Sequence, residues 1–382
     1  MPVPRIKPYV SRAIFNIPGW RTRRKILVIE SDDWGAIRMP SREVYNKCLR
    51  EGYPVDKISY ERYDSLLSED DLGMLFDLLS SFKDQHGKPP AITANCLVAN
   101  PDFERIEAEG FLSYHYELIT ETFKKYPRHK NNFELWKQGM KAGVFHPQYH
   151  GREHVNVSLF MEALQRGDEA SRFGFENRMP GCISKGANGV GNYFVEALRY
   201  HSKEDKDEKL KIFMEGLVLF EKLFGYRSES IIPPNYTWSP DFDASVWAQG
   251  VRYLQGLRLM NEPVPDETSK QHRIYLGKQN ALGQTYLVRN SIFEPSMFGL
   301  GIKDPVDRCL KEMQIAFTLN KPAIITSHRL NYVGHLDPAN RDQTLNMLGQ
   351  ILSRALKRWP DMEFMTSDRL GRLIEADRKI SS

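Results

Sequence analysis

The sequence predicts an α/β protein built from parallel βα units, arranged either as a barrel or as an open doubly wound sheet. Two observations support this fold class. Short apolar, β-branched runs alternate with longer segments in which apolar residues recur at three- and four-residue spacing. Polar residues also follow directly after several of the apolar runs. This pattern is typical of parallel sheets whose active residues lie on loops after the strands.

The first expected strand is the apolar run over residues 25–30, which ends in the polar segment Ser31-Asp32-Asp33-Trp34-Gly35. Six further strands are expected over residues 91–98, 143–145, 230–232, 252–254, 323–326 and 363–365. The helical patterns cover residues 71–82, 156–165, 209–224, 306–319 and 343–358. Residues 101–141 and 256–302 are too long for plain connections, so we expect loops or insertions that shape a substrate cleft.

Length and composition predict one elaborated domain. The chain has 382 residues, of which 41% are hydrophobic and 27% are charged, which is typical of a folded globular protein. Barrel-like α/β enzymes reach this length as a single domain. We therefore expect a barrel domain over residues 25–382, preceded by a basic arm over residues 1–24.

The charge distribution gives no reason to expect nucleic-acid binding, because the formal net charge is only +4 and acidic and basic residues are interleaved. The basic arm is the exception. We expect it to be solvated, with contact to anionic lipid or a polyanionic substrate as the alternative. No apolar run is long enough to span a membrane, and no early signal segment is recognised, so a soluble cytoplasmic enzyme is expected. The sequence does not determine the oligomeric state.

Asp32 and Asp33 are the first candidates for chemistry. Adjacent acids on an extended loop point in different directions, so one carboxylate can bind a metal while its neighbour reaches a bound water. Asp pairs also cap helices and form turns. The pair alone therefore does not predict a site.

His146 and His150 are four residues apart, with Pro147 between them. On a helical turn, for which Pro147 suits the first position, both imidazoles would lie within reach of one ion. His154 extends the spacing by four residues and is a further candidate ligand, partner or substrate contact. His328 ends a later apolar run. Together with the Asp pair, His146, His150 and His328 indicate a metal site of two histidines and one carboxylate, with a spare carboxylate and a spare imidazole.

The order of these motifs resembles a known family. The motifs are Ser31-Asp32-Asp33 after a strand, His146-x-x-x-His150, Ile232-Pro233-Pro234-Asn235-Tyr236, Ser327-His328 and Glu363-Phe-Met-Thr366. The set spans nearly the whole chain and resembles the polysaccharide deacetylase family, which is NodB-type and belongs to carbohydrate esterase family 4. The first motif is also similar to that of YdjC-type deacetylases of small chitooligosaccharides.

The resemblance implies a distorted (β/α) barrel of about seven strands with the site at their carboxyl ends. It implies that Asp32 is the catalytic base, that Asp33, His146 and His150 bind a divalent metal, and that His328 is the acid. Zinc is the first expectation, with cobalt, nickel or another divalent ion as alternatives. The proline motif lacks the arginine that orients the catalytic Asp in this family, because Ile231 and Ile232 precede Pro233.

Other residues are candidates for substrate binding. Asn235, Tyr236 and Trp238 would supply a platform on which sugars stack, although a buried Trp is the commoner arrangement. Arg289 and Glu294 lie in the second insertion, and Arg329 could bind an anionic sugar, brace Asp32 or pair with local acids. His154 completes the expected set.

The expected function is a metal-dependent deacetylase that hydrolyses N- or O-acetyl groups on a glycan or glycan precursor. One alternative is a metal-dependent hydrolase of a non-sugar amide on the same barrel. Another is a catalytically inactive glycan-binding protein. The sequence identifies neither the sugar nor the bond type.

Overall fold

The computed structural model describes residues 13–185, 194–265, 269–297 and 303–381. Its centre is one parallel sheet in the order β10-β7-β6-β5-β2-β1-β12-β11, with β13 also pairing with β1. The strands are β1 (Lys25–Trp34), β2 (Ile92–Leu97), β5 (Phe145–Gly151), β6 (Ser230–Ile231), β7 (Tyr253–Gly256), β10 (Thr285–Val288), β11 (Ser291–Ile292), β12 (Ala323–His328) and β13 (Met362–Met365). The predicted distorted (β/α) barrel is confirmed. All seven expected strands are present, and β10 and β11 come from the second insertion.

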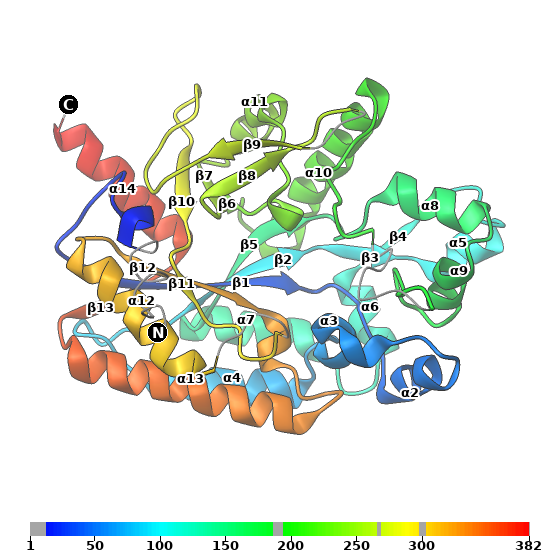
Figure 1. Cartoon of the computed structure of the whole chain (residues 1–382), viewed down its shortest axis with the longest axis horizontal. Coiled ribbons are helices and arrows are strands. Elements are labelled where there is room, and N and C mark those ends of the chain that lie inside the picture. The colour runs from blue at the N-terminus through cyan, green and yellow to red at the C-terminus, as the bar shows by residue number, and fades with distance from the viewer. Residues whose placement is uncertain (1–12, 186–193, 266–268, 298–302, 382) are drawn as a thin grey trace, which may run out of the picture.

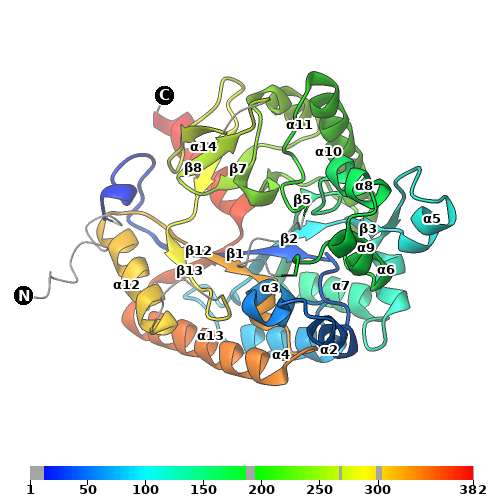
Figure 2. The ribbon, with the colours of Figure 1, turned by 45° about the vertical axis from the view of Figure 1, so that its right-hand side comes forward.

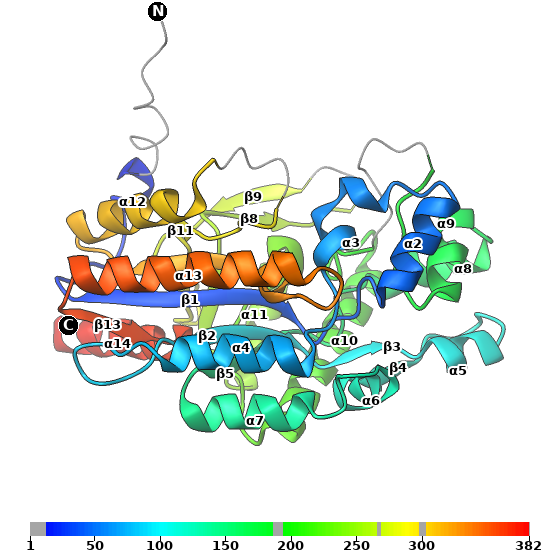
Figure 3. The same ribbon diagram turned by 90° about the horizontal axis from the view of Figure 1, so that it is seen from below.

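Helices surround this sheet (Figure 2). They are α2 (Arg42–Arg50), α3 (Ser59–Tyr63), α4 (Glu69–Ser80), α5 (Phe103–Ala108), α6 (Ile119–Lys125), α7 (Asn132–Ala142), α8 (Val157–Gln165), α9 (Glu169–Glu176), α10 (Lys203–Phe224), α11 (Asp243–Ala248), α12 (Pro305–Thr318), α13 (Pro338–Arg358) and α14 (Ser367–Ser381). Figure 3 shows α12, α13, α4 and α7 in succession along one side of the sheet. Their apolar faces and the strands form the largest core cluster, whose burial stabilises the fold.

The carboxyl ends of the strands point toward α2, α3, α8 and α9 (Figure 1). Both expected insertions contain regular structure. The first includes a short antiparallel pair of β3 (Ala99–Pro101) and β4 (Tyr116–Leu118) together with α5 to α7. The second includes the hairpin of β8 (Leu259–Glu262) and β9 (Lys270–Arg273) before β10 and β11.

The described part of the basic arm packs against the barrel. Lys321 Nζ donates to the carbonyl oxygens of Pro18 and Gly19, each at 2.8 Å. Arg24 makes a two-pronged contact with Glu363 at 2.9 and 2.6 Å. Residues 1–12, which carry Arg5, Lys7 and Arg12, lie outside the described residues. No described helix has the length and apolarity needed to cross a membrane.

Candidate active site

A bulge in β1 turns both members of the Asp pair into one cavity. In a regular strand, adjacent side chains point to opposite faces. The register between β1 and β2 shifts between Ser31 and Trp34, and Asp33 has a left-handed backbone with φ of 72°. Asp tolerates this conformation better than most residues, and bulges redirect side chains near active sites. As a result, Asp32 and Asp33 both line the same cavity.

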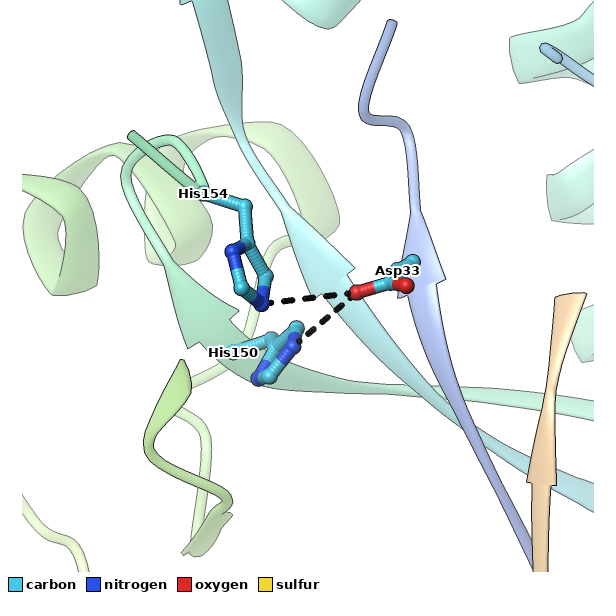
Figure 4. A group of neighbouring side chains, drawn as sticks. All are labelled: Asp33, His150 and His154. Atoms are coloured by element: carbon cyan, nitrogen blue, oxygen red, sulfur yellow. Dashed lines mark ion pairs between the residues drawn. The ribbon is translucent and has the colours of Figure 1, made fainter. Parts of the chain in front are cut away.

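Asp33, His150 and His154 form a group whose ligand atoms all lie within 4.8 Å of one another. Asp33 Oδ1 is 3.4 Å from His150 Nε2 and 3.6 Å from His154 Nε2 (Figure 4). All three side chains are buried. His150 lies near the end of β5, and the chain after that strand brings His154 alongside it, with ring centroids 5.1 Å apart. One carboxylate and two imidazoles therefore converge on one point.

This donor set fits a divalent metal. His150 Nδ1 is 2.8 Å from the carbonyl oxygen of Ile232, which places the proton on Nδ1 and leaves the Nε2 lone pair facing Asp33. A ligating histidine is commonly held by such a contact. Burial lowers the pKa of His154 to about 3, so its imidazole is neutral, as a ligand requires. The carboxylate supplies an anionic oxygen.

His146 does not belong to this group. Residues 145–151 form strand β5, so the helical turn expected there is wrong. Side chains four residues apart on a strand share a face but are separated by about 13 Å at the usual rise per residue. His146 Nε2 instead lies 3.1 Å from Asp368 Oδ1, and the ring stacks on Tyr226. His154 occupies the position in the group that we assigned to His146.

Asp32 is held by an arginine that reaches it from the β10–β11 connection. Arg289 Nη1 and Nη2 donate to the two carboxylate oxygens of Asp32 at 2.7 and 2.6 Å. Asn95 Nδ2 donates to Oδ1 at 2.7 Å. Burial opposes ionisation of Asp32, but the charge and hydrogen bonds of Arg289 outweigh it and hold the pKa at about 2. The arginine missing from the proline motif is thus replaced from another part of the chain.

A second buried carboxylate fixes the other side of this arginine. Arg289 Nε donates to Glu30 Oε2 at 2.6 Å, and Ser367 Oγ donates to Glu30 Oε1 at 2.6 Å. The Arg289 side chain has no exposed surface. The Arg289 guanidinium therefore lies between two carboxylates, and Arg289 does not line this cavity, where a substrate contact was expected.

His328, at the end of β12, also approaches Asp32. Its Nε2 is 3.7 Å from Asp32 Oδ2, and its Nδ1 contacts Glu294 Oε1 at 2.5 Å. Asn331 Nδ2 donates to the other oxygen of Glu294 at 2.7 Å. Burial lowers the pKa of His328, but the Glu294 carboxylate outweighs burial and raises it to about 9. The imidazole is therefore protonated at neutral pH, with Nε2 available as a proton donor.

The cavity that these groups share has a volume of about 220 Å³. Its remaining walls are formed by polar and apolar side chains from the segment after β1, from α3 and the residue before it, from the segment between α9 and α10, and from the proline motif. They are Arg38, Ile58, Tyr60, Glu61, Val195, Pro233, Asn235 and Tyr236. Asn235 and Tyr236 thus lie where substrate contacts were expected.

Three other residues that were expected to contact substrate are buried, have partners elsewhere and do not line this cavity. Trp238 is 4% exposed, packs in the core around α10, and donates to Asp243 at 2.8 Å. Arg329 is 0% exposed and makes a two-pronged contact with Asp64 at 2.9 and 3.2 Å. Glu294 is 2% exposed and orients His328.

The site also contains three residues that were not predicted, namely Glu30, Asn95 and Arg38. The first two carried a signal, because each is a polar residue within a short apolar strand. A polar group buried in such a strand needs a partner. Arg38 carried no comparable signal.

No family model and no curated protein sequence match this chain. Solved structures do resemble it at low identity. One is a putative polysaccharide deacetylase from Mycobacterium smegmatis, with 12% identity, 94% coverage of both chains and a TM-score of 0.43. Another is the Puue allantoinase, with 12% identity, 93% coverage of both chains and a TM-score of 0.45. A third is a putative glycoside hydrolase/deacetylase from Parabacteroides distasonis, with 10% identity and a TM-score of 0.49. That match covers 93% of this chain and 72% of the other.

Proposed function

We propose that the protein is a metal-dependent deacetylase that hydrolyses N- or O-acetyl groups on a glycan or glycan precursor. One observation carries the proposal. An ionised carboxylate, Asp32, and a protonated imidazole, His328, face the same cavity as the Asp33, His150 and His154 group. A base, an acid and a metal site within one cavity are the components of metal-assisted hydrolysis.

Asp33, His150 and His154 would hold the ion. Their nitrogen and oxygen donors suit zinc, and three protein ligands leave a position for water or substrate. When bound, a divalent ion lowers the pKa of water and polarises a carbonyl oxygen. Cobalt and nickel accept the same donors.

Asp32 is the base in this proposal. With its pKa held at about 2 by Arg289, the carboxylate is ionised throughout the neutral range. It can accept the proton that water loses as the oxygen attacks the acetyl carbonyl. Arg289 and Asn95 fix the carboxylate, so its direction is set before substrate arrives.

His328 is the acid. Glu294 keeps the imidazole protonated, and the Nε2 proton passes to the nitrogen or oxygen of the leaving sugar as the acetyl C–N or C–O bond breaks. The products are acetate and the deacetylated sugar. His328 then recovers its proton from solvent before the next turnover.

A purely glycan-binding role explains this arrangement less well. Buried charges cost free energy unless each is paired, and here a series of pairs fixes an acid and a base beside a three-donor group. A glycan-binding surface needs none of these pairs. A hydrolase of a non-sugar amide would use the same residues. Assays with both kinds of substrate distinguish it from a glycan deacetylase.

The test is acetate release from a panel of N- and O-acetylated monosaccharides and oligosaccharides. Zinc-loaded wild type should release acetate, chelator-treated protein should not, and added zinc should restore the activity. Asp32→Asn should reduce kcat by about 10² to 10⁴, whereas His146→Ala should retain activity. Acetate release that survives both Asp32→Asn and chelation would contradict the proposal. Release from acetylated non-sugar amides alone would favour the other hydrolase.

A further inference from the structure

Arg38 lies on the cavity wall beside Asp33. The proposed base, Asp32, is paired with Arg289, and the proposed acid, His328, is paired with Glu294, so neither is paired with Arg38. Its side chain is 14% exposed. Its Nε is buried without a hydrogen-bond partner among the described residues. The nearest carboxylate oxygens are Asp64 Oδ2, 3.7 Å from Nε, and Asp33 Oδ2, 3.8 Å from Nη2. Hydrogen bonds of this type span roughly 2.7–3.2 Å, so both contacts are too long.

Both neighbouring carboxylates have closer partners. Asp64 accepts two hydrogen bonds from Arg329, and the other oxygen of Asp33 faces His150 and His154. A bound metal ion would neutralise Asp33. Arg38 would then remain as a cation on the cavity wall without a matched carboxylate.

Glu61 does not supply that carboxylate. It shares the cavity with Arg38, but burial raises its pKa to about 8. It is therefore mostly protonated and uncharged at neutral pH. A largely buried cation of this kind is costly unless a ligand completes its hydrogen bonds.

The position of Arg38 relative to the acid restricts what it can contact. Its guanidinium carbon is 5.3 Å from the centre of the Tyr60 ring, a cation–π distance that holds the side chain in place. The same ring meets His328 edge-on at 5.9 Å. Arg38, Tyr60 and His328 therefore lie in succession on one wall of the cavity. This places Arg38 close to the imidazole of His328, which would protonate the leaving sugar.

We propose that Arg38 binds a carboxylate group of the substrate, so that the preferred substrate is an acetylated sugar that carries a carboxylate, such as an N-acetylated uronic acid. The inference rests on the proposed deacetylase function for the identity of the reaction. A guanidinium presents paired N–H donors that match the two oxygens of a carboxylate. Arg38 lines the cavity in which the leaving sugar would lie.

The test uses two substrates that differ only at C6, N-acetylglucosamine and N-acetylglucosaminuronic acid, with zinc-loaded protein. Wild type should prefer the carboxylated sugar by at least about tenfold in kcat/KM. In Arg38→Gln, kcat/KM for the carboxylated sugar should fall by about ten- to a hundredfold, which removes the preference. Arg38→Lys should give an intermediate result, because it keeps the charge without the paired donors. Arg50→Gln, which removes the same charge from the exposed end of α2, should behave as wild type.

Binding without turnover provides the second measurement. Calorimetric titration with glucuronate and with glucose, together with the metal content of each variant, separates recognition from catalysis. Glucuronate should bind more tightly than glucose to wild type, and Arg38→Gln should remove the difference while retaining the metal.

Equal affinity of wild type for the two sugars would overturn the inference. So would an Arg38→Gln variant that loses metal and both substrates equally, because that result would assign Arg38 to positioning Asp33. Tighter binding of inorganic phosphate than of glucuronate would overturn the carboxylate class. Glucuronate binding that depends on Arg38, without acetate release from either sugar, would instead contradict the deacetylase function and leave the carboxylate site supported.

Discussion

Arg289 is fully buried between two carboxylates, so its replacement by methionine tests how the base is held. The change removes charge-assisted hydrogen bonds of 2.6 Å to Glu30 and of 2.7 and 2.6 Å to Asp32. The side chains of Glu30 and Asp32 are 0% and 4% exposed. Breaking a buried pair by removing one partner costs about 3–5 kcal/mol. This is a large part of the roughly 5–15 kcal/mol that stabilises an ordinary domain.

The loss of stability in Arg289→Met should also depend on pH. In wild type, Arg289 holds the pKa of Asp32 at about 2, below its unfolded value of about 3.9. Asp32 therefore stabilises the fold above about pH 4, by about 3 kcal/mol, and this contribution is lost as pH falls toward 2. Without Arg289, burial raises the pKa of Asp32 above the unfolded value. The variant should then gain stability relative to wild type as pH falls from 7 to 5.

Urea unfolding at pH 7 and pH 5 measures both effects. Arg354→Met is the matched control, because Arg354 and its partner Asp307 are 53% and 40% exposed, and such surface pairs contribute about 0–1 kcal/mol. If Arg289→Met is too unstable to isolate, Arg289→Lys retains a charge and should show a smaller loss. A stability deficit below 1 kcal/mol, or one that does not change between pH 7 and 5, would refute the reasoning.

Three further predictions concern the acid, the metal and the core. Glu294→Gln removes the carboxylate that raises the pKa of His328 to about 9, so the alkaline limb of the pH–rate profile should move to lower pH; an unchanged limb would show that His328 is not the acid. Zinc at 100 times its dissociation constant should raise the free energy of unfolding by about 2.7 kcal/mol, as measured by thermal or urea unfolding, and an equal gain in Asp33→Ala would exclude this site as its cause. Leu348→Ala on α13, at a fully buried position, should cost about 2–5 kcal/mol while kcat per folded molecule stays unchanged, and a lower kcat would contradict separation of core and site.

The barrel could be predicted from sequence because strands such as β1 and β12 begin as continuous apolar runs. Within the central sheet, the strands that escaped prediction are β10 and β11, which have four and two residues. Both lie within residues 256–302, where loops or insertions were expected. They are nevertheless essential to the site, since the connection between them carries Arg289.

The histidines of the candidate metal group were predicted only in part, because a spacing of four residues places side chains differently on a helix and on a strand. Side chains four residues apart lie close together on one face of a helix. On a strand such as β5, the same spacing separates them by about 13 Å. The chain after the end of β5 at Gly151 returns His154 to His150. That return depends on tertiary structure. The Asp32–Arg289 contact joins residues 257 positions apart, and only the buried polar residues Glu30 and Asn95 indicated that partners were needed.

The most direct test of the proposed metal centre is the zinc content of wild type and single-alanine variants after loading and dialysis. We expect one ion per chain in wild type and in His146→Ala, and loss of that ion in Asp33→Ala, His150→Ala and His154→Ala. Retention of zinc by His154→Ala together with its loss from His146→Ala would contradict the ligand set. The absence of bound zinc, cobalt or nickel in wild type would contradict the metal-dependent mechanism.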